Sequence, residues 1–82
     1  MKTRMNTSKS GGSAKFSERL KIAMNERGMH RPVDLWKALV ANGYTGRYQT
    51  VLYWIDGVFE PSLGNAAMIA RSLGKTVEFF VS

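Results

Sequence analysis

A short stretch near the middle of the chain carries side chains that can hydrogen-bond to the edges of DNA bases. The stretch runs from Gly46 to Tyr53, and its apolar pattern has a helical period. With about 100° of rotation per residue, four apolar residues are predicted on the buried side: Val51, Trp54, Ile55 and Val58. Gln49 and Tyr53 then point the opposite way, with Gly46 beside them. Glutamine can form two hydrogen bonds with adenine, so this pattern favours a base-reading surface.

The same outward side lacks charge. No charged residue occurs from Tyr48 to Ile55, where an ordinary surface helix would carry lysine and glutamate. A carboxylate there would repel phosphates, and the first one is Asp56. The short Gly46 lets the start of the helix approach a DNA backbone, whose phosphate oxygens can accept bonds from free N–H groups. The alternative is that three of these residues simply extend the core: Tyr48, Leu52 and Tyr53.

The overall charge indicates an anionic partner. The 82 residues include twelve Lys and Arg against six Asp and Glu, which gives a net charge of +6. A basic balance on one small domain is typical of nucleic-acid binding, although charge also keeps a protein in solution.

The composition argues against an enzyme or a cofactor protein. There is no cysteine, and the single histidine, His30, has no second ligand for a metal. The acidic residues are scattered, so no pair is placed for acid–base catalysis. No run approaches the roughly 18 apolar residues of a membrane span. We therefore expect a cytoplasmic, nucleoid-associated protein with no metal, no cofactor and no membrane, and the short chain makes a small-molecule ligand unexpected.

Four helices are predicted to position these residues. They cover about residues 14–27, the segment from Pro32 to the Asn42-Gly43 turn, residues 47–55, and the segment between Ser62 and Gly74. The expected caps are Ser13, Thr45 and Ser62 at the starts and Gly28, Gly57 and Gly74 at the ends. Residues 1–13 are predicted to be a flexible basic arm with Lys2, Arg4 and Lys9, and residues 14–82 the folded domain.

The tail of the chain has a different period. Val77, Phe79 and Val81 alternate with other residues, which predicts a short strand. A lone strand leaves its backbone groups unpaired, and a twofold-related copy is the simplest supplier of a partner. We therefore predict dimer contacts at these three residues. The alternative is an irregular last turn in which Phe79 and Val81 cover the core.

One combination of elements extends over about residues 15–75. It has two helices joined through a glycine, a turn, a helix ending in Trp-x-x-Gly, and then Pro-Ser-Leu. The residues concerned are Phe16, Leu20, Arg27-Gly28-Met29, Leu35, Leu39, Val51, Trp54, Gly57, Pro61-Ser62-Leu63 and Ile69 to Gly74. As a set, they resemble the lambda-repressor/Cro (XRE) helix-turn-helix family.

The resemblance implies a compact all-α domain of four or five helices, whose third helix enters the major groove of DNA. By position, it implies base-facing roles for Tyr48, Gln49 and Tyr53. It places Thr45 and Arg47 at phosphate or groove-edge positions and Arg31 at a phosphate. Two features depart from the family. Trp36 stands where a small residue is usual, and the turn over residues 40–44 is longer. The angle between the second and third helices can therefore differ from the family norm.

These observations predict a transcriptional regulator, in the first place a repressor, that binds a palindromic operator as a homodimer. One alternative is an antitoxin that binds a toxin protein and also represses its own operon. The C-terminal residues resemble the dimerising strand of some antitoxins in the same family. The other alternative is a phage-encoded protein that binds a host regulator without contacting DNA.

Overall fold

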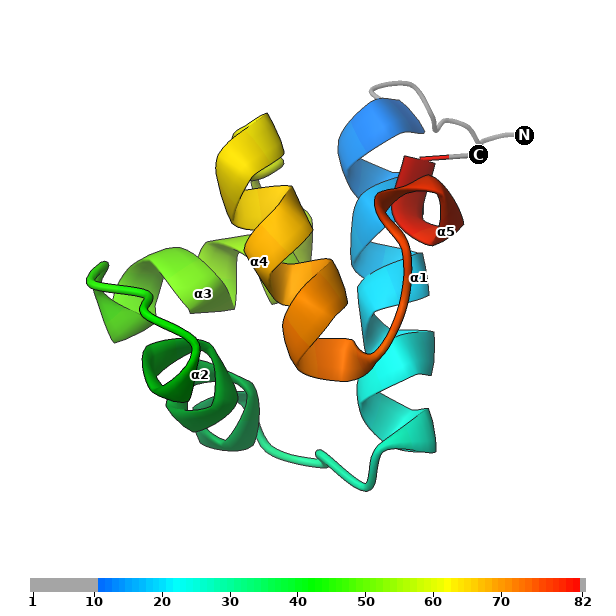
Figure 1. The fold of residues 1–82 in the computed structure, drawn as a ribbon. Helices are drawn as coiled ribbons and strands as arrows, with labels where there is room; N and C mark the ends of the chain where they lie inside the picture. Colours follow the sequence, from blue (N-terminus) through cyan, green and yellow to red (C-terminus); the bar gives the residue numbers. More distant parts are fainter. Residues whose placement is uncertain (1–10, 82) are drawn as a thin grey trace.

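The computed structural model describes residues 11–81, with side chains from Lys15 onward, and this range forms five helices and no strand (Figure 1). The helices are α1 (Gly11–Glu26), α2 (Pro32–Ala41), α3 (Tyr48–Asp56), α4 (Leu63–Leu73) and α5 (Val77–Val81). The predicted all-α class with four or five helices is confirmed. Residues 1–10 of the predicted arm lie outside the described residues, and residues 11–13 already belong to α1.

One core joins all the helices. The helix α1 packs against α3 and α5, α2 packs against α3 and α4, and α4 packs against α5. Four helices each contribute a residue with no exposed surface to the centre of this core: Leu20, Leu35, Val51 and Ile69. In the view of Figure 1 the α2–α3 pair lies on the left and the α1–α5 pair on the right, with α4 drawn between them. The α2–α3 pair therefore has one side in the core and one side toward solvent.

Local signals in the sequence set most helix ends. Pro32 occupies the first turn of α2, and the Ser62 hydroxyl accepts a hydrogen bond from the Asn65 N–H (3.3 Å) at the start of α4. Gly57 and Gly74 follow α3 and α4 in the left-handed conformation, as predicted. Two predicted caps are wrong. Ser13 lies inside α1, which begins at Gly11, and the N-cap of α3 is Arg47 and not Thr45.

The predicted C-terminal strand is wrong, because residues 77–81 form the helix α5. Phe80, which the alternating pattern did not group with Phe79, is 1% exposed and stacks on Phe16 with ring centroids 5.2 Å apart. The Arg19 guanidinium donates a hydrogen bond to the Phe79 carbonyl oxygen (3.1 Å), which ties the end of α5 to α1. Burial of Phe80 thus overrides the alternating pattern. The three residues of the predicted dimer strand therefore form no strand in this conformation: Val77 and Phe79 pack against the core, and Val81 is exposed at the end of a helix.

Candidate nucleic-acid interface

The helix α3 has one apolar side and one polar side, as its sequence predicts. Val51, Trp54 and Ile55 are buried, and Trp54 is only 2% exposed. Gln49 is exposed, and Tyr53 is 37% exposed. The prediction that Gln49 and Tyr53 face outward is therefore confirmed.

Val58 does not join the buried side of α3, so that prediction is wrong. The helix ends at Asp56, and the left-handed conformation of Gly57 (φ 77°) turns the chain before Val58. The Val58 N–H bonds back to the Tyr53 carbonyl oxygen (2.9 Å), and its side chain is left exposed. Extrapolation of the helical period past a terminating glycine caused the error.

Tyr48 is partly exposed and also packs against a neighbouring helix. Tyr48 is the first residue of α3, and its side chain is 36% exposed. Its ring packs edge-on against the ring of Trp36 in α2, with 5.7 Å between the ring centroids. Trp36 is half-buried, and its indole N–H is buried with no hydrogen-bond partner in the described part of the chain. The large residue that departs from the family pattern thus packs beneath the start of α3.

The turn before α3 is fixed by a buried tyrosine that the sequence reading did not single out. Gly43 adopts a positive φ of 101°, which lets the chain reverse after α2, and the Tyr44 N–H bonds to the Leu39 carbonyl oxygen (2.9 Å). The Tyr44 ring lies 5.6 Å from that of Trp54 and is 7% exposed. Burial raises the pKa of Tyr44, and a hydrogen bond with the Thr50 side chain acts in the opposite direction. The Thr50 side chain is therefore engaged in a hydrogen bond on the inner side of α3.

Gly46 has a structural reason to be glycine. A Cβ atom at this position would overlap the Tyr44 hydroxyl group and two carbons of its ring. The sequence analysis interpreted Gly46 as a place of close approach to DNA. The structure shows a close approach within the protein, and Gly46 itself remains exposed.

The start of α3 offers a cation and free backbone donors. Thr45, Gly46 and Arg47 are all exposed, and the N-cap residue Arg47 makes no side-chain capping bond. The first N–H groups of a helix have no partner within the helix, and the helix dipole adds partial positive charge there. These three residues therefore lie together at an end of α3 that favours anions.

Arg31 is also exposed, but it has an acidic partner. Its guanidinium forms an ion pair with the Asp34 carboxylate (2.8 Å), and the same carboxylate accepts a bond from the Arg31 backbone N–H (3.3 Å). The Arg31 hydrogen bond holds the pKa of Asp34 below its ordinary value. Arg31 is thus a weaker phosphate candidate than Arg47, because Asp34 offsets its charge.

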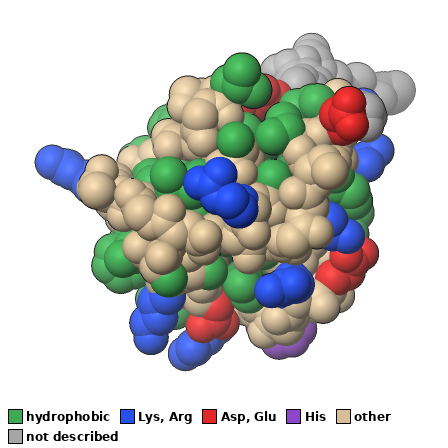
Figure 2. Space-filling model, in the orientation of Figure 1, with side chains coloured by type: hydrophobic (Ala, Val, Ile, Leu, Met, Phe, Trp, Pro, Cys, Tyr) green, Lys and Arg blue, Asp and Glu red, His purple; other side chains and the backbone are tan. Residues whose placement is uncertain are grey.

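The charge changes along α3. Arg47 precedes the helix, its outward side is uncharged, and Asp56 ends it. Figure 2 shows basic side chains (blue) projecting at the left and lower-left edges of the molecule, over the α2–α3 region of Figure 1. Acidic side chains (red) lie among those at the lower left. Three further basic residues, at positions 2, 4 and 9, account for half of the net charge of +6 and lie outside the described residues.

From the last turn of α3 to the first residue of α4, the chain carries an exposed apolar stretch of four residues that the sequence analysis did not identify. We call it the apolar cluster: Tyr53, Val58, Phe59 and Leu63. The rings of Tyr53 and Phe59 are 5.2 Å apart, and Leu63 at the start of α4 is 77% exposed. Exposed apolar groups of this kind are typical of protein contacts. The signal in the sequence was a connector with two adjacent apolar residues, Val58 and Phe59, and one proline.

No group of three His, Cys, Asp or Glu side chains that could hold a metal occurs within residues 11–81. In the same range, no helix has the length and apolar character needed to cross a membrane. Comparison of the chain with protein-family models, with curated proteins and with solved structures found no match. The resemblance to the lambda-repressor/Cro family therefore rests on the residues of the chain alone.

Proposed function

We propose that this chain is a sequence-specific DNA-binding regulator that represses transcription by occupying its site. One observation carries the proposal. The helix α3 presents an exposed and uncharged outward side, with Gln49 and Tyr53, directly after an exposed cationic start at Arg47. The fold makes no use of Gln49, so its side chain is free to bond to a base.

The two parts of this surface would do different work. Gln49 would form paired hydrogen bonds with adenine in the major groove, and Tyr48 and Tyr53 would contact neighbouring bases from the same side. Arg47, Thr45 and the free N–H groups at the start of α3 would bind phosphates, which fixes the position of the helix on the duplex. Arg31 contributes less, because Asp34 must first release it.

The experiment starts with selection of a bound sequence from random DNA, followed by titration with that sequence and with a scrambled duplex. Gln49→Ala should lower affinity for the selected DNA about 5- to 100-fold and leave affinity for scrambled DNA nearly unchanged. Arg47→Ala should weaken both complexes and reduce the slope of log K against log salt by about one. Lys15→Ala, which removes an exposed charge from α1, is the matched control. It should weaken both complexes by less than Arg47→Ala does. Equal loss on both duplexes for Gln49→Ala would remove it as a reader of bases.

A homodimer on a palindromic site is a further part of the proposal. Because the described residues form no strand, we assign the contact to the three members of the apolar cluster that lie outside the base-reading side, Val58, Phe59 and Leu63, which are exposed in a single copy. Leu63→Asp tests this contact, because an acidic residue in the first turn of α4 favours the helix dipole and should leave the fold intact. Sedimentation should show a dimer for the natural chain and a monomer for the variant. A natural chain that stays monomeric at all concentrations, alone and on DNA, would overturn this part.

A second candidate function is that of an antitoxin, because the same apolar cluster also suits a different protein partner. Co-expression with the products of the adjacent genes would then yield a stable complex with one small protein. Leu63→Asp should abolish that complex and leave DNA binding by α3 in place. A complex that survives this variant would place the partner on another surface.

A further inference from the structure

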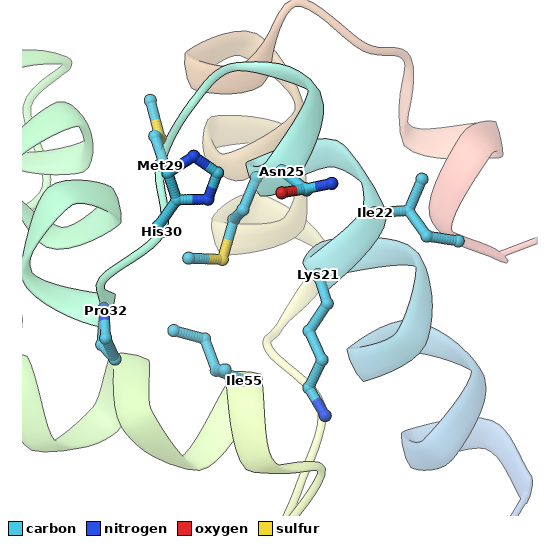
Figure 3. A pocket seen from close by; sticks show the side chains of 8 residues that line it. Lys21, Ile22, Asn25, Met29, His30, Pro32 and Ile55 are labelled. Atoms are coloured by element: carbon cyan, nitrogen blue, oxygen red, sulfur yellow. The ribbon is translucent and has the colours of Figure 1, made fainter.

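A groove of about 540 Å³ lies on the inward side of α3, beside the buried Ile55 (Figure 3). Its walls come from the second half of α1, the loop to α2, the first residue of α2 and the end of α3. The lining residues are Lys21, Ile22, Met24, Asn25, Met29, His30, Pro32 and Ile55. Figure 3 shows Met29, His30, Pro32 and Ile55 around an opening between the three helices. Cavities of about 300–1,000 Å³ are the usual size for small-molecule sites.

The floor of the groove is apolar and is held by the fold. Met24 and Ile55 belong to the core and are almost fully buried. After α1 ends, the Met29 N–H bonds to the Met24 carbonyl oxygen (2.8 Å), which draws the loop back over the helix. This bond brings the two methionines to the same groove. Methionine side chains adapt to irregular apolar shapes, so the floor can accept different ring or chain outlines.

The rim of the groove is polar and carries positive charge. Lys21 is exposed, and no acidic group pairs with it within residues 15–81. Asn25 and His30 add hydrogen-bonding groups, and no carboxylate lines the groove. In Figure 3 the Lys21 side chain extends from α1 toward the end of α3. The groove therefore combines an apolar floor with one cation at its edge.

We propose that this groove binds a small organic anion, with an apolar body on the methionine and isoleucine floor and a carboxylate or sulfonate beside Lys21. This proposal goes beyond DNA binding and departs from the sequence-based expectation of no small-molecule ligand. It does not depend on the outward side of α3. A ligand seated here would touch α1, the loop, α2 and α3 at once, so it would hold the α2–α3 pair against α1.

A pair of fluorescent probes tests the proposal without DNA. Anilinonaphthalene sulfonate has an apolar body and one negative charge, and phenyl-naphthylamine is the same molecule without the sulfonate. Titration of the full chain should show that the anionic probe binds more tightly. Lys21→Gln should weaken the anionic probe by up to about fivefold, the range of a surface ion pair, and leave the neutral probe unchanged. Lys15→Gln is the matched control on the same helix and should alter neither.

A second variant tests the location. Asn25→Trp places a large ring at an exposed position of α1 on the rim of the groove, so it should exclude both probes while the helical circular dichroism is retained. Leu63→Asp should leave both probes in place, because it alters the apolar cluster and not the groove. Probe binding that is unchanged by Lys21→Gln and Asn25→Trp, or that disappears in Leu63→Asp, would overturn the proposal. None of these outcomes bears on whether α3 reads DNA.

Discussion

The inward and outward sides of the α2–α3 pair are built from different kinds of residue. The inward side is apolar and closely packed: Leu35, Leu39, Tyr44, Val51 and Trp54 are all buried. The outward side of α3 is open and polar, with Gln49 exposed, and at the start of α2 Arg31 and Asp34 form an ion pair at the surface. Each inward residue has an evident packing role, whereas the fold gives no reason for glutamine at position 49.

This difference separates two kinds of constraint. Packing fixes the inward residues, since a change of even one methylene group is felt in a close-packed core. Gln49 is under no such constraint, and an ordinary helix surface at that position would accept lysine or glutamate. An uncharged outward side on a chain of net charge +6 is therefore the feature that calls for a function. Substitutions on the two sides can test whether the separation is real.

Trp54→Ala should have the largest effect. Removal of this buried ring from beneath Tyr44 should lower the free energy of unfolding by about 3–5 kcal/mol. Gln49→Ala, five positions earlier on the outward side, should change it by less than about 0.5 kcal/mol. Urea unfolding followed by circular dichroism measures both. Similar losses of unfolding free energy in the two variants would contradict the distinction between a packed inward side and an unconstrained outward side.

Gly46→Ala should have the next largest effect. The added methyl group would overlap the Tyr44 side chain, so the turn or the ring must move, at a cost of about 1–3 kcal/mol. Gly64→Ala in α4 is the matched control, because a Cβ there meets nothing within 4 Å. It should be neutral or stabilise the helix by up to about 1 kcal/mol. If Gly46→Ala leaves the unfolding midpoint unchanged, close packing does not explain the glycine, and the earlier interpretation of an approach to DNA gains ground.

Much of the fold could be predicted because its signals are local. The buried side of α3, the proline at the start of α2, the Ser62 cap and the glycine that ends α4 all follow from residue type and spacing. The outward direction of Gln49 and Tyr53 follows from the helical period.

What could not be predicted depends on contacts between distant residues. Tyr44 looks like an ordinary turn residue until Trp54 is placed beside it. The tail was misassigned because a run of five residues fits a strand or a helix equally well, and contact with Phe16 decides in favour of the helix. The groove beside Lys21 needs three helices to be assembled before it exists.

A smaller effect should appear at alkaline pH, on the inward side. Burial raises the pKa of Tyr44 above its unfolded value of about 10. The stability that this group contributes is therefore complete below about pH 10 and is lost as the pH rises through the folded pKa. Tyr44→Phe removes the ionisation, so it should lose less stability than the natural chain between pH 9 and about pH 11. If the free energy of unfolding falls equally with pH in the natural chain and in Tyr44→Phe, Tyr44 is not the group that causes the loss.

The smallest effect should come from the outward ion pair. The hydrogen bond from Arg31 lowers the pKa of Asp34, so its contribution is present above the unfolded value of about 3.9 and is lost as the pH falls through the folded pKa. In Asp34→Asn the thermal unfolding midpoint should therefore fall less steeply than in the natural chain as the pH drops below about 4. At neutral pH, high salt should reduce the difference in midpoint between the two proteins, because it screens the exposed ion pair. A loss at neutral pH as large as that of Gly46→Ala would mean that the outward side also supports the fold. Arg31 would then be committed to Asp34, and Arg47 would remain as the cation available to a phosphate beside α3.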